Sequence, residues 1–572
     1  MPNVIDHDLI IFGAGLAGLR TAIEAARRSE GKLNIAIVTK NQMMRAHSVA
    51  AEGGTAAVLR LEQGDSFDLH AWDTVKGSDF LADQDVVHRF VRIIPDEIRQ
   101  LEHWGIPWTR WEDGKIAQRP FGGHSYPRAV LAADKTGFFE LQTLYDTLLK
   151  YANVKHYNEF YVTSILVEDN VFKGLVAFDM SSGQFHLLRG KGLVIASGGG
   201  GTLFGFTTYS QTVTGDGLAL AYRAGIPLED MEFVQFHPTG LVPSGILMTE
   251  ACRGEGGYLV NSKGERFMAN YAPERMELAP RDLVSRSEMK EIEAGRGFKG
   301  PEGLDYIYLD LRHLGADKIN DRLPLIREVC LHYNDLDPID EPIPCRAVAH
   351  YSMGGIETDI DGATRIPGVW AAGEAACVSL HGANRLGSNS TAECLVWGKI
   401  VGEQAASYCA DQKDLGNAPM PLFEKQVKWV SEEIKGMNGK ENLYEVRREL
   451  RKTMDQNVGV FRTEEGLAEA QTRIRALKER YKNINIHDKS GSYNTNLIHA
   501  LELGNLLELA DVMVTGGLAR KESRGAHARR DYPVRDDDNW LKHTLATRQD
   551  GKIELSYKPV VISTWKPVER KY

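Results

Sequence analysis

The sequence has few cysteines and no arrangement of them that suits a metal cluster. Six occur among 572 residues, and no two are closer than fifteen positions. Zinc sites and iron–sulfur clusters usually draw on cysteines about two to four positions apart. We therefore predict no metal and no iron–sulfur cluster within this chain. So few cysteines in so long a chain are typical of a reducing compartment.

Long apolar runs and an excess of positive charge are also missing. The first apolar run, Leu9–Leu19, contains three glycines and follows the acidic residues Asp6 and Asp8. It is too short to span a bilayer and lacks the basic start of a signal peptide. The net charge of −10 argues against a nucleic-acid partner. With 42% hydrophobic residues, the composition is that of a globular protein.

Glycine, by contrast, is abundant, with 56 residues, and its clusters carry information. A buried β-type run, Asp8–Phe12, leads into a glycine turn and then into a helical segment, Leu19–Arg28. Gly13 permits a tight turn, Gly15 permits close approach of a pyrophosphate, and Gly18 permits packing of helix on strand. The turn predicts a dinucleotide site formed by Gly13, Ala14, Gly15, Leu16, Ala17 and Gly18.

The second β-type run, Asn34–Thr39, ends without the acidic residue that an NAD site uses. Thr39 and Lys40 stand there instead, which argues against NAD. Glu374 follows a late apolar run and could bind a ribose, so we predict FAD across a sheet with strands from both ends of the chain. Asp216 either lines the same site or caps the helix after it.

Seven further motifs occur in order along the chain. They are Arg45–Gly54, Thr214–Gly217, Phe236–Gly240, Met248–Gly257, Ala279–Asp282, His350–Gly355 and His381–Ser390. With them the chain resembles the flavoprotein subunit of the succinate dehydrogenase/fumarate reductase family, the succinate:quinone oxidoreductases of complex II. The resemblance covers nearly the whole length, including Ala519–His527. A missing acid after the second strand is usual in that family.

The resemblance implies an α/β fold built around a Rossmann-like FAD-binding domain that is split in the sequence. Residues 1–240 and 346–410 would form that domain, and residues 241–345 an inserted α+β capping domain. Residues 411–510 would form a helical domain and residues 511–572 a small C-terminal domain. Local patterns agree, since charges and prolines fill the predicted insertion and charged helical periodicity runs from about 415 to 510.

In the family, a histidine that matches His47 carries FAD covalently. Alkylation of the flavin raises its reduction potential, which suits a weakly reducing substrate such as succinate. Ala46 is a small departure, since other members have Ser or Thr before this histidine. The remaining cofactor residues implied are Thr39, Lys40, Ser48, Gly53, Gly54, Asp216, Glu374, Ser390 and Thr391.

The substrate implied is a four-carbon dicarboxylate, a dianion that needs a local cationic pocket in an acidic protein. His237, Thr249, His350 and Arg385 match the family residues that hold its carboxylates. Hydride would pass between the substrate and FAD, and the proton would pass through Arg281, relayed by Glu250 and Arg253. Geometry alone would favour a histidine as the acid or base. Arg281 could instead only stabilise developing charge.

The resemblance also implies an iron–sulfur subunit and a membrane anchor with quinone, on the cytoplasmic side of the cell membrane. The basic segment 520–530 is either a docking surface for such a partner or a solvated charge run. Cys252 is either a reactive thiol or a small apolar filler. The alternatives are an L-aspartate oxidase with noncovalent flavin, and a flavoprotein that binds flavin without redox chemistry or modifies tRNA. The direction of the reaction is not encoded in this chain.

Overall fold

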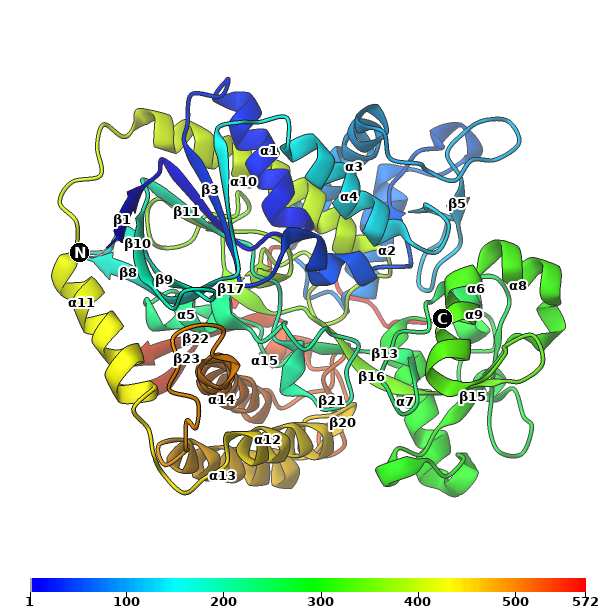
Figure 1. Ribbon diagram of the computed structural model, residues 1–572. Helices are drawn as coiled ribbons and strands as arrows, with labels where there is room; N and C mark the ends of the chain where they lie inside the picture. The colour runs from blue at the N-terminus through cyan, green and yellow to red at the C-terminus, as the bar shows by residue number, and fades with distance from the viewer. Residues whose placement is uncertain (1–2, 572) are drawn as a thin grey trace.

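The computed structural model describes residues 3–571 (Figure 1). Residues 1–2 and 572, which belong to the predicted first and last domains, lie outside the described residues. A five-stranded parallel sheet forms the centre of the FAD-binding region, in the order β18-β11-β2-β3-β7. Its strands are β2 (Leu9–Phe12), β3 (Ile35–Thr39), β7 (Val154–Asn158), β11 (Gly192–Ile195) and β18 (Val369–Ala371).

The predicted split of this region is confirmed, because β18 comes from residues far along the chain and pairs with β11. Leu9 to Phe12 are all buried, as expected for a strand covered on both faces. Helices packed against one another cover one face, with α1 and α10 side by side (Figure 1). These helices are α1 (Leu16–Arg28), α2 (Phe67–Gly77), α3 (Gln84–Trp104), α4 (Thr136–Leu148) and α10 (Asn389–Asp411).

Smaller sheets flank this centre. One has the order β1-β10-β9-β8 and another the order β4-β6-β5. Their strands are β1 (Asn3–Asp6), β4 (Thr55–Ala56), β5 (Gln118–Arg119), β6 (Ala129–Val130), β8 (Phe160–Glu168), β9 (Val171–Asp179) and β10 (Phe185–Arg189). Helix α5 (Asp216–Arg223) packs near β8.

The segment near residues 241–345 forms a lobe with its own apolar core, seen in green at the right of Figure 1. Its antiparallel sheet has the order β13-β16-β15-β14. The lobe contains or borders β13 (Val234–Leu241), β14 (Tyr258–Val260), β15 (Ile307–Asp310), β16 (Ile343–Ser352), α6 (Ala251–Gly254), α7 (Arg281–Glu291), α8 (Ala316–Arg322) and α9 (Pro324–Asn334). Strands β13 and β16 continue across the predicted limits of this insertion, so the lobe and the FAD-binding region share these two strands.

The last third of the chain is helical and then returns to strands. Its elements are α11 (Met420–Lys428), α12 (Leu443–Asn457), α13 (Glu464–Tyr481), α14 (Thr495–Ala519), α15 (Asp537–Trp540), β20 (Phe461–Arg462), β21 (Ala528–Arg529), β22 (Lys542–Gln549) and β23 (Lys552–Pro559). Strands β22 and β23 join a sheet in the order β19-β17-β12-β22-β23. Their partners are β12 (Leu228–Glu229), β17 (Gly355–Glu357) and β19 (Ala376–Cys377). Helix α14 crosses the predicted limit at residues 510 and 511, so the domain division stays a prediction.

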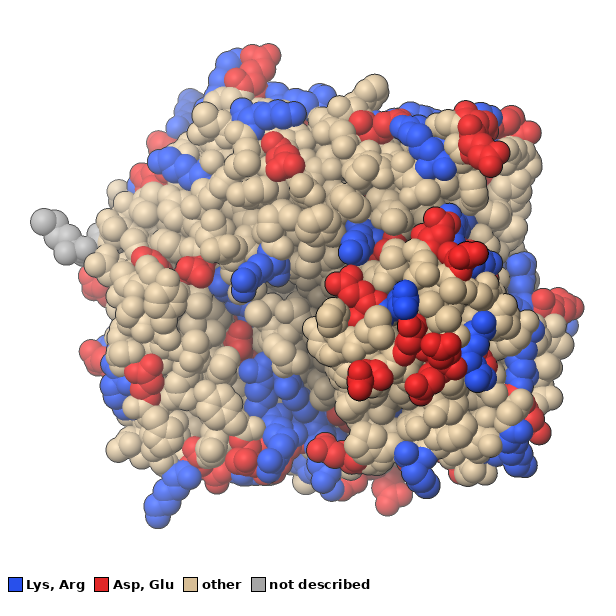
Figure 2. Space-filling model, turned by 45° about the vertical axis from the view of Figure 1, so that its right-hand side comes forward, with Lys and Arg blue, Asp and Glu red and all other residues tan. Residues whose placement is uncertain are grey.

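Among the described residues, no helix combines the length and the apolar character that crossing a membrane requires. Helix α14 is apolar, but it also carries charged residues and packs against α5, α12 and α13. Figure 2 shows side chains of both signs on the face it presents, with Lys and Arg gathered at the lower centre and Asp and Glu on the lobe at the right. Acidic side chains therefore do not cover this whole face.

Candidate active site

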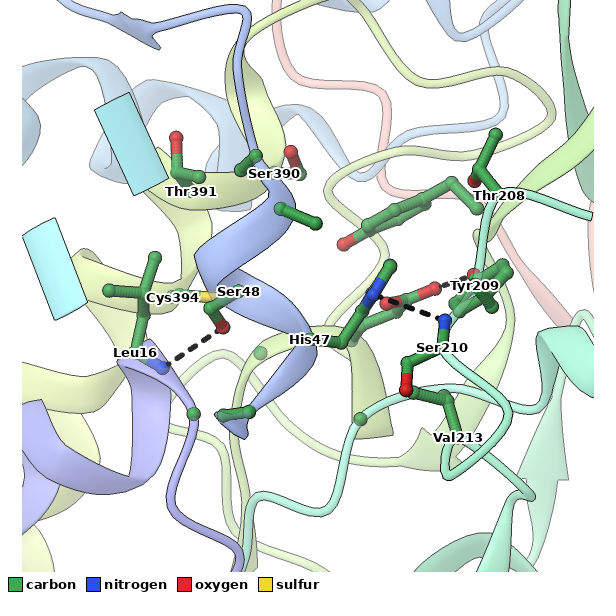
Figure 3. Close-up of a pocket in the computed structure, with 18 of the residues that line it drawn as sticks. Leu16, His47, Ser48, Thr208, Tyr209, Ser210, Val213, Ser390, Thr391 and Cys394 are labelled. Atoms are coloured by element: carbon green, nitrogen blue, oxygen red, sulfur yellow. Dashed lines mark hydrogen bonds between the residues drawn. The ribbon is translucent and has the colours of Figure 1, made fainter. Parts of the chain in front are cut away.

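The turn between β2 and α1 has the geometry of a phosphate cradle. Gly13 has φ +117°, and a Cβ there would lie 2.1 Å from the carbonyl oxygen of Ala196. A Cβ at Gly18 would lie 2.1 Å from the carbonyl oxygen of Gly13, so Gly18 permits close helix–strand packing. The N–H of Leu16, the first residue of α1, donates to the Ser48 hydroxyl at 3.2 Å (Figure 3). The start of α1 lines the cavity, and helix N-termini of this kind can bind an anion.

A single cavity of about 550 Å³ brings together nearly all residues that the sequence predicted. The predicted residues that line it are Gly13, Ala14, Gly15, Leu16, Ala17, Thr39, Lys40, His47, Ser48, Gly53, Gly54, Asp216, His237, Thr249, Glu250, Arg281, His350, Glu374, Arg385, Ser390 and Thr391. Gly18 and Arg253 do not line it, because Gly18 packs against Gly13 and Arg253 lies behind Glu250. Residues separated by hundreds of positions thus form one site.

Lys40 forms a buried ion cluster at one end of the cavity. Its Nζ lies 2.6 Å from Oδ2 of Asp216 and 2.8 Å from Oε1 of Glu502. Asn505 donates to the other oxygen of Asp216 at 2.8 Å. These carboxylates raise the pKa of Lys40 against the effect of burial, and Lys40 lowers the pKa of Asp216 although burial opposes this. Asp216 therefore pairs with the lysine and lines the cavity, and Glu502 is a partner that no sequence motif indicated.

His47 lies at the side of the cavity on the short 3₁₀ helix η2 (His47–Ala50), where Figure 3 shows it facing Ser210. Its Nδ1 accepts a hydrogen bond from the backbone N–H of Ser210 at 3.4 Å. Its ring stacks on Tyr209 with 5.0 Å between centroids. Burial lowers the pKa of His47 to about 4, so the imidazole is neutral. Within residues 3–571, no hydrogen-bond partner is found for its Nε2.

Glu374 lies in the cavity wall beside Tyr209. The Tyr209 hydroxyl donates to Oε1 of Glu374, and the N–H of Ser352 donates to the same oxygen at 3.0 Å. Burial raises the pKa of Glu374 to about 7. The carboxyl group lines the cavity, where it can accept a hydrogen bond from a hydroxyl group of a cofactor. Tyr209 is a further cavity residue that the sequence motifs did not reveal.

Two histidines from neighbouring strands face each other at the other end of the cavity. The rings of His237 on β13 and His350 on β16 have centroids 5.0 Å apart. Nε2 of His237 has no hydrogen-bond partner among the described residues, whereas Nδ1 of His350 pairs with the Thr208 hydroxyl at 2.9 Å. Burial, reinforced by Arg281, holds the pKa of both histidines well below the usual value. Both imidazoles are therefore neutral hydrogen-bonding groups.

Arg385 is a buried cation without a carboxylate partner among residues 3–571. Its side chain is 2% exposed and its Nε has no hydrogen-bond partner in that range. The guanidinium lies over the ring of Tyr351, 4.3 Å from the centroid. The Tyr351 hydroxyl donates to Glu393 at 2.9 Å, which fixes the ring. A buried unpaired guanidinium is costly unless an anion joins it, so this geometry favours a carboxylate ligand.

Arg281 and Glu250 form a close ion pair beside the two histidines. Nε of Arg281 lies 2.7 Å from Oε2 of Glu250, and Arg253 lies 3.5 Å from the same oxygen. Burial, together with Arg385 and Arg253, lowers the pKa of Arg281 to about 10. Glu250 keeps a lowered pKa because the arginines outweigh its burial. An ionised Glu250 thus links Arg281, which lines the cavity, to Arg253, which does not.

Two sequence-based alternatives are decided by burial. Cys252 does not line the cavity, and burial raises the pKa of its thiol well above the usual value, so it is an apolar filler. The prediction that residues 520–530 form a docking surface is wrong for three of their arginines, because these side chains are not exposed. Arg520, Arg524 and Arg529 are buried and pair with acidic side chains, among them Glu522. Arg520 and Arg524 neutralise buried carboxylates, whereas Arg529 pairs with the partly exposed Asp531, and composition alone does not reveal these pairings.

Comparison with known families and structures agrees with this geometry. The family model described as "FAD binding domain" matches residues 8–391, and that described as "Fumarate reductase flavoprotein C-term" matches residues 447–572. The fumarate reductase flavoprotein subunit of Mycobacterium tuberculosis is 46% identical, with 99% of each chain covered. The Rickettsia conorii succinate dehydrogenase flavoprotein subunit is 44% identical, covering 98% of this chain and 97% of that protein.

Solved structures give the same result. A variant of FrdA from the Escherichia coli quinol fumarate reductase has a TM-score of 0.96 at 45% identity, with 99% of each chain covered. The fold and the cavity define an FAD-dependent oxidoreductase. More particularly, the chain belongs to the family of fumarate reductase and succinate dehydrogenase flavoprotein subunits.

Proposed function

We propose that this chain interconverts succinate and fumarate on FAD that is attached through His47. The observation that carries the proposal is the buried guanidinium of Arg385, which has no carboxylate partner among residues 3–571 and shares its cavity with the His237–His350 and Arg281–Glu250 pairs. When bound, FAD supplies a two-electron acceptor and donor of hydride. The phosphate cradle at Gly13 and the start of α1, which line the cavity, fit its pyrophosphate.

The dicarboxylate would be held between neutral and cationic donors. Arg385 offers a planar fork that matches one carboxylate, and Thr249 lies in the same wall. His237 and His350 are neutral, so each can donate one ring N–H without adding charge. The positive charge at this end therefore comes from arginines, which remain protonated over a wide pH range.

Arg281 would hold and move the proton that is exchanged at the substrate carbon. Its lowered pKa and its contact with Glu250 support this role, since both reduce the cost of sharing a proton along the line to Arg253. Arg253 also donates to the backbone carbonyl of Glu277, which fixes its orientation. If Arg281 only stabilised charge, Glu250 would still position it.

The surroundings of His47 support covalent attachment. Nδ1 of the neutral imidazole accepts from the N–H of Ser210, so the ring carries its proton on Nε2. Nε2 is therefore the atom that would bond to the cofactor, and it would lose that proton as the bond forms. Tyr209 stacks on the ring and fixes its plane.

We further infer that the electrons pass to an iron–sulfur subunit, and from there to quinone in a membrane anchor on the cytoplasmic side. The described cysteines are single and mostly buried, and no pair forms a cluster motif. One similar structure is titled "Quinol-Fumarate Reductase with Menaquinol Molecules", with a TM-score of 0.95 at 46% identity. That likeness supports a shared arrangement of subunits.

The test is a two-direction assay of the purified complex with succinate plus an oxidising quinone and fumarate plus a reduced quinone. We expect turnover in both directions, with competitive inhibition by malonate. The ratio of the two rates gives the preferred direction, which this chain leaves open. L-Aspartate serves as the control substrate. Oxidation of aspartate without turnover of succinate or fumarate would replace the proposal with the aspartate oxidase alternative.

A further inference from the structure

Glu140 on α4 is a buried carboxyl group that neither the cofactor site nor the substrate site uses. Its side chain is 0% exposed, and it forms no ion pair with any residue in the range 3–571. Its Oε2 has no hydrogen-bond partner in that range, while Oε1 accepts from the hydroxyl of Thr55. An isolated buried carboxylate is expensive, so this group is expected to carry a proton.

The hydroxyl of Thr55 connects Glu140 to the wall of the cavity. It lies 2.7 Å from the hydroxyl of Thr391, and either oxygen can be the donor. Thr391 lies in the first turn of α10 and lines the cavity, on the same side as Ser390 in Figure 3. Glu140, Thr55 and Thr391 thus form a relay of three side chains from the protein interior to the cofactor site.

The relay ends at the catalytic part of the cavity. Helix α10 begins directly after the loop that carries Arg385, and the backbone carbonyl of Ser388 in that loop accepts from the N–H of Ala56, next to Thr55. On its other side, α4 packs against the segment of His47, where the N–H of Gly137 donates to the carbonyl of Ala51 at 2.6 Å. His47 and Thr391 line the same cavity, so a cofactor ring attached at His47 would share that cavity with Thr391.

The surroundings of Glu140 contain few charges. Cys394 on α10 is the titratable side chain that feels its charge. On the packed helices α1 and α3, Arg20 and Glu24 pair with each other and Arg20 also pairs with Glu97. On residues 43–50, which pack against α4, Arg45 is exposed and His47 is neutral. Burial raises the pKa of Glu140 to about 8, so its ionisation falls within an accessible range.

We propose that Glu140, acting through Thr55, sets the direction of the hydrogen bond that Thr391 offers to the flavin ring. When Glu140 is protonated, it donates to Thr55, Thr55 donates to Thr391, and the Thr391 hydrogen is free to point into the cavity. When Glu140 loses its proton to solvent, Thr55 donates to the carboxylate and Thr391 donates to Thr55. Thr391 then presents only lone pairs to the ring. Glu140 and Thr55 are positioning residues, and the proposal rests on the FAD site proposed above.

A hydrogen-bond donor aimed at the ring stabilises the electron density that reduction adds, and an acceptor does the reverse. The flavin of the oxidised protein should therefore report the state of Glu140 in its visible absorption. Across the pH range in which Glu140 titrates, its uptake of a proton should accompany the two-electron reduction of the flavin. Neither property requires turnover to be observed.

The experiment is a pH titration of the visible flavin spectrum of the oxidised, substrate-free complex from about pH 6 to about pH 10. We expect a reversible spectral transition in the native protein that is absent in Glu140→Gln, which cannot ionise. It should also be absent in Thr55→Val, which interrupts the relay, and retained in Thr55→Ser, which keeps the hydroxyl. The pH dependence of the flavin midpoint potential should be shallower in Glu140→Gln than in the native protein.

A second buried carboxyl group in the cavity wall provides the matched control. Burial raises the pKa of Glu52 well above its usual value. A transition that persists in Glu140→Gln but disappears in Glu52→Gln would overturn the proposal, as would a native protein with bound flavin and no transition. Absence of flavin altogether would instead contradict the proposed cofactor site. If Thr55→Val does not fold, infrared difference spectra provide a second measurement. The band of a protonated carboxyl group should be present in the native protein and lost in Glu140→Gln.

Discussion

Arg385 and Arg281 share one cavity but have different partners, and this difference is the basis for the separate roles we propose for them. Arg385 rests on Tyr351 without an ion pair among the described residues, so its charge is available to an incoming carboxylate. Arg281 is already held by Glu250 and by Gln235 at 3.0 Å. The sequence motifs named both arginines. Tyr351 follows His350 directly in the sequence, yet the contact of its ring with Arg385 exists only in the folded chain.

The first prediction for a single residue concerns Arg281. Replacing it with Gln should lower kcat by about 10²- to 10⁴-fold, the range that a proton-transferring group contributes. The dissociation constant for malonate, followed by flavin absorbance, should change by less than about tenfold, because Arg385 remains. Partial recovery in Arg281→His would support proton transfer. An unchanged kcat with a raised KM would assign Arg281 to binding alone.

The second prediction concerns His47. In His47→Ala the flavin should remain bound to the folded protein but separate from it in denaturing electrophoresis, because only the covalent link survives unfolding. Succinate oxidation should fall more than fumarate reduction, since the unlinked flavin has a lower potential. His332→Ala, an exposed position on α9, is the control and should keep a fluorescent band. Fluorescence that persists in His47→Ala would place the attachment elsewhere.

Among the secondary-structure elements, the β2–α1 turn shows how closely the backbone packs around the cofactor site. Gly13 combines a positive φ with a carbonyl oxygen that leaves no room for a side chain. Strand, glycine turn and helix were predictable from the sequence, because each depends on residues close together in the chain. Helix α14 is different, since its Glu502 reaches Lys40 from more than four hundred residues away.

The prediction for this element is that Gly13→Ala loses FAD. The new methyl group would meet Ala196 and would also strain a residue with φ +117°. Gly64→Ala separates these effects, because Gly64 has φ +96° but no atom lies within 4 Å of the position that its Cβ would take. The ratio of flavin to protein absorbance should drop severalfold in Gly13→Ala and stay near the native value in Gly64→Ala. Equal loss in both variants would point to backbone strain instead.

For the whole molecule, the C-terminal strands close the fold onto the FAD-binding region. His543 on β22 inserts between acidic side chains, with Nδ1 2.6 Å from Asp230 and Nε2 3.2 Å from Asp83. Lys558 on β23 pairs with Glu229 at 2.7 Å. His543 and Lys558 neutralise these carboxylates, and their ion pairs connect strands that are distant in the sequence.

From the ion pairs of His543 we predict that the free energy of unfolding of the protein depends on pH. Its carboxylates raise the pKa of His543 to about 10 against the effect of burial, whereas the value in the unfolded chain is about 6.5. A raised pKa means that the stabilisation is complete below about pH 6.5 and is lost as the pH rises towards 10. His543→Gln should lower the free energy of unfolding by about 3 kcal/mol near pH 6.

Thermal unfolding of native protein and His543→Gln at several pH values measures this effect. The difference in midpoint should be largest near pH 6 and should narrow steadily towards pH 10. His332→Ala should show no such dependence, because its side chain is exposed. A difference that stays constant with pH would mean that His543 contributes by packing rather than by charge.

The nucleotide turn, the order of the motifs, the split α/β fold and the family all followed from the amino-acid sequence alone. Each of these depends on residue type and on spacing along the chain. Which charges are buried and paired became visible only in the folded chain. Folding placed Arg520, Arg524 and Arg529 inside, joined Lys40 to Asp216 and Glu502, kept His237 and His350 neutral, and left Arg385 unpaired among the described residues. Desolvation and charge pairing depend on distances between atoms in space, which spacing along a chain does not set.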